Sequence, residues 1–123
     1  MKIEELKDLV LNTLEDMKAV EVVTIDVRGK TSITDIMVIA SGTSDRHVKA
    51  LAEAVAFQAK QAGERVLGME GEREGEWALV DLNGVVVHVM QPKVRDFYQL
   101  ERLWRMDEPD EASTDGDIAA PGA

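Results

Sequence analysis

The spacing of apolar positions predicts three helices along the chain. Residues 2–18 and 44–62 both carry apolar side chains three or four positions apart, as on one face of an amphipathic helix. Gly63 is suited to end the second helix, and Pro92 is suited to begin a third. The apolar positions of the three segments are Ile3, Leu6, Leu9, Val10, Leu14 and Met17; Val48, Leu51, Ala52, Val55, Ala56 and Ala59; and Val94, Phe97, Leu100 and Trp104.

Strand patterns fill the intervals between these helices. Residues 20–29 are rich in β-branched side chains that alternate, which predicts a strand ending at a glycine. Residues 33–41 are nearly continuously apolar, as expected of a central strand covered on both faces. The run RVLGME is a short candidate strand, and residues 77–90 hold two strands joined by Asn83-Gly84, a strong hairpin signal.

The predicted order of elements is αββαβββα, within one domain of residues 1–105. A right-handed crossover through the helix at 44–62 would make part of the sheet parallel, and the hairpin would make another part antiparallel. A chain of 123 residues is long enough for one domain. We therefore predict an α/β fold: a single domain with a mixed sheet flanked by helices.

The amino-acid composition limits the classes of protein to which this chain can belong. Apolar residues make up 45% and charged residues 31%, as in ordinary soluble domains. The absence of cysteine excludes disulfides and thiolate metal sites. No apolar run approaches the ~20 residues needed to span a bilayer, and the acidic, amphipathic start does not resemble a signal peptide. These features predict a cytoplasmic protein without a membrane partner.

The formal charge of −10 is unevenly distributed. Residues 106–123 hold six acids and no base, with neither aromatics nor apolar periodicity, so they are predicted to form a disordered acidic tail. Because six of the 24 acids lie there, residues 1–105 hold 18 acids against 14 bases, a net charge of −4. An acidic domain argues against extensive nucleic-acid contact, which needs clustered Lys and Arg. Docking on a protein component is the better expectation.

The turn SGTS at residues 41–44, between a strand and a helix, invites three chemical interpretations. As a phosphate loop it lacks the Walker and dinucleotide fingerprints. As part of a nucleophilic site with His47, it lacks the G-x-S-x-G elbow and an orienting acid. The favoured interpretation is structural: Ser44 or Thr43 caps the helix, and Gly42 fits a tight turn.

The third interpretation, nucleotidyl transfer, needs paired carboxylates to hold two metal ions. Asp35 and Asp81 each stand alone on separate strands, so the pair is missing. His88 is a single histidine in a strand, where hydrogen-bonded structure is commoner than metal ligation. The sequence therefore predicts no catalytic, cofactor or metal site.

With the catalytic interpretations set aside, the remaining functional signal in the sequence is a candidate surface for protein recognition. Trp77, Leu79 and Asp81 share one strand face by alternation, and Tyr98, Arg102 and Arg105 are candidates for the less buried side of the last helix. Trp, Tyr and Arg are the usual anchors of protein interfaces. The alternative is that Trp77 and Trp104 belong to the core. If Trp77 is an anchor, its truncation should weaken binding with near-normal unfolding.

Three stretches in combination resemble the ribosomal silencing factor (RsfS, Iojap-like) family. They are TSITDIMVIASGTSDRHVKALAE, GMEGEREGEWALVDLNGVVVHVMQP and RDFYQLERLW, and the resemblance covers residues 1 to about 105. The resemblance implies a fold similar to nucleotidyltransferases without their catalytic carboxylates, and a homodimer. It also implies binding to universal large-subunit ribosomal protein fourteen on the large subunit.

A protein bound there would block subunit joining and repress translation when nutrients are scarce. The resemblance thus implies a protein that is not an enzyme and needs no cofactor. Its contact surface is expected around Trp77 and its strand neighbours Leu79 and Asp81, with Tyr98 as a further candidate. The competing interpretation is a nucleotide-binding or nucleotidyltransferase-like enzyme.

Overall fold

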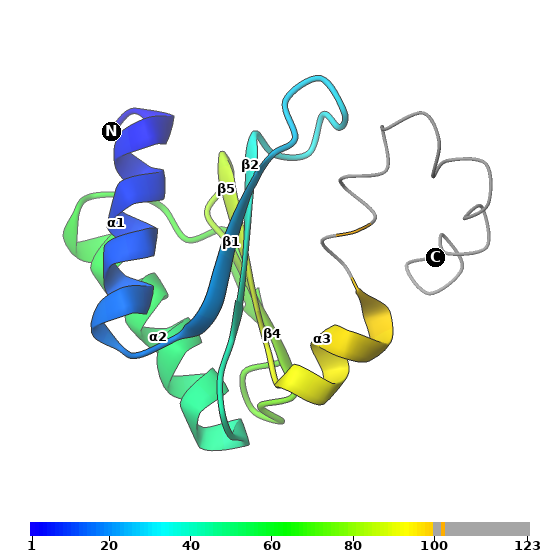
Figure 1. Cartoon of the computed structure of the whole chain (residues 1–123). Helices are drawn as coiled ribbons and strands as arrows, with labels where there is room; N and C mark the ends of the chain where they lie inside the picture. The colour runs from blue at the N-terminus through cyan, green and yellow to red at the C-terminus, as the bar shows by residue number, and fades with distance from the viewer. Residues whose placement is uncertain (100–101, 103–123) are drawn as a thin grey trace, which may run out of the picture.

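The computed structural model describes residues 1–99 and 102, and its elements follow the predicted order (Figure 1). The predictions for Leu100, Trp104, Arg105 and the tail at 106–123 lie outside the described residues. The helices are α1 (Ile3–Asp16), α2 (Asp45–Gln61) and α3 (Pro92–Tyr98), and the strands are β1 (Val20–Asp26), β2 (Ile36–Ser41), β3 (Gly68–Glu70), β4 (Trp77–Asp81) and β5 (Val85–Met90).

The strands form one five-stranded sheet in the order β1-β2-β5-β4-β3. β2 and β5 pair in parallel, and the other neighbours pair antiparallel. The predicted mixed sheet flanked by helices is therefore confirmed. The central strand predicted at 33–41 is shorter in the structure, because residues 33–35 belong to the preceding loop. β2 itself is buried along its whole length.

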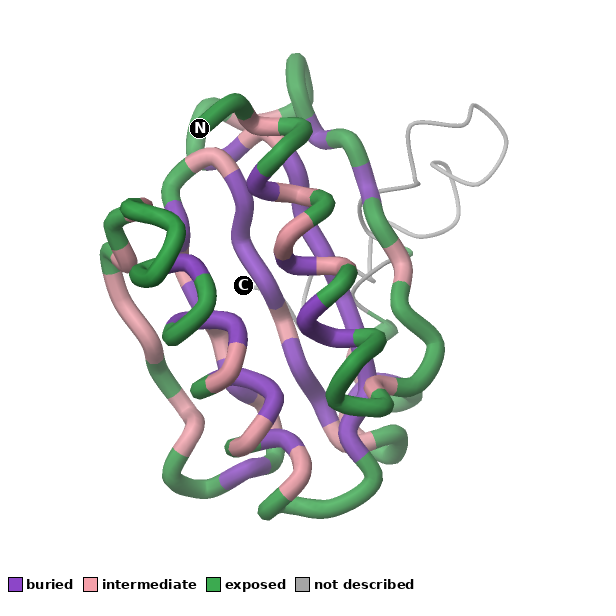
Figure 2. The backbone as a smooth tube through the Cα atoms, turned by 90° about the vertical axis from the view of Figure 1, so that its left-hand side faces the viewer, coloured by how far each residue is buried: buried purple, intermediate pink, exposed green. Residues whose placement is uncertain are grey.

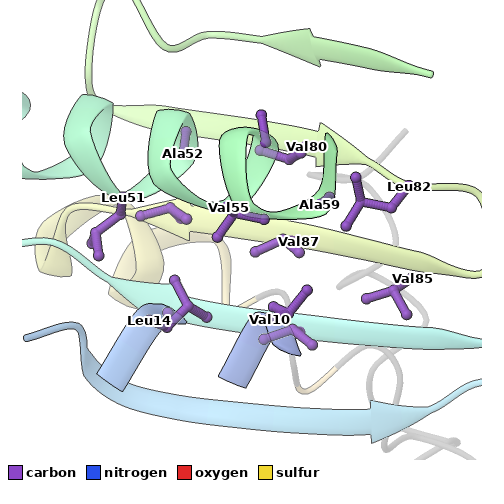
Figure 3. Close-up of a cluster of buried hydrophobic side chains, with 14 of the residues drawn as sticks. Val10, Leu14, Leu51, Ala52, Val55, Ala59, Val80, Leu82, Val85 and Val87 are labelled. Atoms are coloured by element: carbon purple, nitrogen blue, oxygen red, sulfur yellow. The ribbon is translucent and has the colours of Figure 1, made fainter. Parts of the chain in front are cut away.

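α1 and α2 lie side by side on one face of the sheet, with their buried positions toward it (Figures 1 and 2). All six predicted apolar positions of α2 are buried, and so are Leu6, Val10 and Leu14 of α1. Figure 3 shows side chains of both helices meeting Val80, Val85 and Val87 of the sheet. Met17 departs from the predicted stripe, with 36% of its surface exposed, because α1 ends at Asp16.

Local chemistry sets the ends of several elements. β1 ends at Asp26 instead of the predicted Gly29, because the Asp26 carboxylate accepts hydrogen bonds from the backbone and guanidinium of Arg28 and turns the chain. Gly63 follows α2 with φ +85°, as predicted for a helix end. In the hairpin, Asn83 is the left-handed residue, with φ 74°. A Cβ on Gly84 would overlap Cδ1 of Ile3, so a larger residue here would require the Ile3 side chain to move.

The opposite face of the sheet carries a second, smaller apolar cluster: Ile25, Val27, Met37, Ile39 and Met90. α3 lies over one end of this face, where Val94 packs against the cluster (Figure 1). The loop between β1 and β2 lies over the other end. Within the part of the chain that the structure describes, this arrangement leaves the middle of the face open.

Candidate docking surface on the open sheet face

Four half-buried side chains occupy the open middle of this face: Trp77, Leu79, Asp81 and His88. We call them the open strip. In β4, half-buried positions alternate with Ala78 and Val80, which are fully buried on the helix-covered side. The predicted shared face of Trp77, Leu79 and Asp81 is therefore confirmed.

Trp77 joins the open strip to α3. Its ring centroid lies 5.9 Å from that of His88 and 5.0 Å from that of Tyr98. Tyr98 in turn meets Phe97 edge-on, with ring centroids 4.9 Å apart, and Phe97 is 76% exposed. Trp77 also packs against the apolar cluster that contains Met90. It is thus part core and part surface, which combines the two alternatives that the sequence left open.

His88 is a member of the strip that the sequence predictions did not include. Its Nδ1 accepts a hydrogen bond from Trp77 Nε1–H at 3.0 Å. Nδ1 is therefore unprotonated, and Nε2 carries the proton of the neutral ring. Burial lowers the pKa of His88 to about 4 from its ordinary 6.5, so the ring is neutral at pH 7. Counting back from the hairpin turn places His88 opposite Leu79, a signal that could have found it.

Two hollows lie along the strip. The first, which we call the apolar pocket, has a volume of about 200 Å³ and a lining that is almost entirely apolar. The loop before β2 lines it with Thr31, Ile33 and Thr34, and the strands contribute Met37, Leu79, Asp81, Val86 and His88. The second is shallower and is lined by Glu70, Gly71, Trp77, Leu79 and His88. Ile33 was predicted to lie in the covered strand at 33–41, but β2 begins only at Ile36, and Ile33 lies in the preceding loop with 76% of its surface exposed.

The ionised groups that line the two hollows are acidic. They are Asp81 and Glu70, since His88 is neutral at pH 7. Asp81 Oδ1 accepts the backbone N–H of Asn83 at 2.9 Å, which holds this carboxylate at the hairpin. The open strip therefore combines an apolar floor with negative charge at its edges. Such a surface suits a basic protein that carries an apolar contact.

At the α3 end, Arg95 is buried and donates a hydrogen bond from Nη1 to Ser41 Oγ at 2.9 Å. This bond ties α3 to the end of the central strand. Tyr98, the predicted site residue on this helix, is half-buried against Trp77, and Arg102 is exposed. The structure thus brings all four predicted docking residues together on one face.

The turn at residues 41–44 has the structural role that the sequence favoured. Ser44 Oγ accepts the backbone N–H of His47 at 3.1 Å and caps α2. His47 Nδ1 accepts the N–H of Thr43 at 2.9 Å, and its Nε2 lies 2.8 Å from the carbonyl oxygen of Met17. Nε2 thus links α2 to the end of α1, and Nδ1 holds the turn that precedes α2. A Cβ on Gly42 would come within 3 Å of Val48, so the turn needs glycine there.

The strand register separates the lone carboxylates from this turn. Asp81 lies opposite Val86, which lies opposite Met37. Ser41 is four residues further along β2, or about 13 Å at the usual rise of a strand. Asp35 precedes β2, so it lies at the Met37 end as well. Residues 1–99 and 102 contain no cluster of three or more His, Cys, Asp or Glu side chains that could hold a metal ion.

No helix in the described part of the chain combines the length and the apolar character that a membrane crossing requires.

Comparison with known proteins identifies the relatives of the chain. The model of the family "Ribosomal silencing factor during starvation" matches residues 1–121. Ribosomal silencing factor RsfS of Chromobacterium violaceum is 45% identical over 109 residues, which are 89% of each chain. A crystal structure of a C. violaceum protein superposes with a TM-score of 0.83 at 46% identity, over 85% of this chain and 87% of that one.

A more distant relative comes from mouse. The protein named Mitochondrial assembly of ribosomal large subunit protein 1 is 31% identical over 102 residues, which are 80% of this chain and 45% of the mouse protein. The resemblance noted in the sequence thus extends from bacteria to mitochondria.

Proposed function

The chain belongs to the ribosomal silencing factor family, and from this premise we propose that it binds the large ribosomal subunit through universal large-subunit ribosomal protein fourteen. Membership implies a ribosome-associated regulator of translation. The name of the mouse relative concerns assembly of the ribosomal large subunit, which supports the large subunit as the partner.

The observation that carries the proposed mode of binding is the open strip. A half-buried Trp, a Leu and an adjacent apolar pocket form a surface with acidic edges, on a face that α1 and α2 do not cover. Ribosomal proteins are commonly basic, so complementary charge would favour rapid association. A docking area of ~800 Å² per partner is enough for a stable complex.

The proposed mechanism is steric. A domain bound where the small subunit docks would prevent the two subunits from joining and would repress translation during starvation, without a chemical step. We further propose that the protein works in the cytoplasm and as a homodimer, as the family resemblance implies. Sedimentation equilibrium of the purified chain tests the dimer, because a dimer has twice the 13.6 kDa mass of the chain.

Co-sedimentation with purified ribosomal particles tests the partner. The protein is mixed separately with isolated large subunits, isolated small subunits and joined ribosomes, and each mixture is separated on a sucrose gradient. We expect it to travel with large subunits. Sedimentation with small subunits alone, or with none of the particles, would refute the proposal. Trp77→Ala serves as the surface variant, and Phe57→Ala, an exposed aromatic on α2, as its matched control.

A further inference from the structure

We propose that the apolar pocket receives one apolar side chain of the partner protein, and that a basic residue beside that side chain pairs with Asp81. This inference rests on the proposed function, since it specifies how the open strip recognises its partner. It concerns the pocket formed by Ile33, Met37, Leu79, Asp81, Val86 and His88.

The size of the pocket defines the group that it can hold. Its volume is about 200 Å³. A buried apolar cavity of roughly 150 Å³ can hold a benzene ring. The pocket therefore suits one branched aliphatic or one aromatic side chain. A side chain buried in such a pocket is the kind of central contact that supplies most of the binding energy of a protein interface.

The walls of the pocket are held in place before binding. Met37 and Val86 are buried neighbours on paired strands and form its floor. His88 is fixed through Nδ1 by Trp77, and no described residue bonds its Nε2–H. Ile33, on the loop before β2, forms an exposed wall of the pocket. A wall that is already ordered costs less conformational entropy on binding.

Charge selects the class of partner. Asp81 is the ionised residue among those that line the pocket, and Glu70 lies beside the neighbouring hollow. These carboxylates repel phosphate groups, so the pocket disfavours ribosomal RNA and favours a basic protein. One carboxylate oxygen of Asp81 holds the Asn83 N–H, and the other has no hydrogen-bond partner among the described residues. A Lys or Arg of the partner can bind there.

Two substitutions alter the pocket in opposite ways. Val86→Phe fills its floor, and Ile33→Ala removes an exposed wall without disturbing the core. Val22→Phe is the matched control, because Val22 is an exposed valine of β1 in a hollow beside α1. Melting curves show which variants fold. If Val86→Phe does not fold, Ile33→Ala decides the outcome.

The binding experiment titrates each variant against isolated large subunits. We expect Val86→Phe and Ile33→Ala to weaken binding about tenfold or more, the effect of losing a central contact, and Val22→Phe to stay within about twofold of the parent. Parental affinity in a folded pocket variant would overturn the inference and leave the proposed function standing. If the parent chain itself does not bind large subunits, both fall.

A photo-crosslinking amino acid at Leu79 identifies the class of molecule that reaches the pocket. With large subunits, we expect a crosslink to a ribosomal protein. A crosslink to ribosomal RNA alone would overturn the inference that the occupant is a protein side chain. Asp81→Asn keeps the oxygen that holds the hairpin and removes the charge. We expect it to make binding less sensitive to salt than in the parent chain.

Discussion

Trp77 donates a hydrogen bond from its indole Nε1 to Nδ1 of His88 at 3.0 Å, which joins neighbouring strands β4 and β5 on the open face of the sheet. The bond determines which tautomer His88 adopts. It also holds the Trp77 ring at a position where Tyr98 of α3 contacts it, with ring centroids 5.0 Å apart. Strand β4, strand β5 and helix α3 thus meet at the Trp77 ring. Substitutions of Trp77 or His88 should therefore change the stability of the fold measurably.

The first prediction concerns pH. The folded protein excludes a proton from His88 until about pH 4, whereas the unfolded chain binds it near the ordinary pKa of 6.5. His88 therefore makes its full contribution to the free energy of unfolding above pH 6.5. This contribution is lost progressively as the pH falls from 6.5 toward 4. At 1.4 kcal/mol per pKa unit, and with allowance for its partial exposure, the loss is about 1–3 kcal/mol.

Urea unfolding at pH 7 and pH 4.5, for the parent chain and for His88→Gln, measures this contribution. Glutamine offers Trp77 an acceptor but does not titrate. The parent should lose more stability than His88→Gln between the two pH values. Equal losses would mean that His88 is as easily protonated in the fold as in the unfolded chain.

The second prediction concerns Trp77. The near-normal unfolding expected for a pure anchor must be revised, because the ring packs on the apolar cluster and on Tyr98. Trp77→Ala should lower the free energy of unfolding by about 1–3 kcal/mol, less than the ~3–5 kcal/mol for a fully buried ring. It should also weaken binding to large subunits about tenfold or more.

Trp77→Phe separates these effects, because it retains a ring but lacks the N–H that bonds His88. We expect Trp77→Phe to retain most of the stability of the parent chain. Its affinity for large subunits should lie between that of the parent and that of Trp77→Ala. Chemical denaturation and subunit titration on the same samples give both quantities. Unchanged binding in a folded Trp77→Ala would exclude this residue from the interface.

The third prediction tests the turn at residues 41–44. Ser44→Ala removes the N-cap of α2 and should cost about 1 kcal/mol of stability. His47→Ala removes contacts to Thr43 and Met17 and should cost at least as much. Neither residue lines the open strip, so the binding of both variants to large subunits should match that of the parent. A folded variant that fails to bind would give the turn a direct role.

The fourth prediction concerns catalysis. Asp35 and Asp81 lie at the opposite end of the sheet from the small-residue turn, so the two parts of a nucleotidyl-transfer site are not assembled. The purified protein with Mg²⁺ and labelled nucleoside triphosphates should transfer no nucleotide. A metal-dependent activity that Asp35→Asn or Asp81→Asn abolishes would restore the enzyme interpretation.

Much of the fold could be read from the sequence, because periodicity reports which side of an element is buried. The six apolar positions of α2 predicted their burial correctly, and so did the part of the run at 33–41 that forms β2, whereas Ile33 is exposed in the preceding loop. Errors fell at element ends, where individual side chains decide. Asp26 ends β1 early through Arg28, and Met17 leaves the stripe because α1 stops one residue before it.

The candidate site was only partly predictable. Alternation placed Trp77, Leu79 and Asp81 on one face, since that depends on neighbouring positions in one strand. The apolar pocket also needs the loop residue Ile33 and the buried Met37, which come from a different part of the chain. No local pattern reports that such residues meet. The pairing of His88 with Trp77 likewise depends on the hairpin register as well as on composition.

Reassociation of purified ribosomal subunits tests the central claim most directly. Isolated large subunits are incubated with increasing amounts of the protein, small subunits are added, and joined ribosomes are measured by light scattering. We predict that joining falls as large subunits become occupied, that Val22→Phe inhibits at the same concentration as the parent, and that Val86→Phe needs about tenfold more protein or more for the same inhibition. Normal joining on large subunits that demonstrably carry the protein would contradict the account.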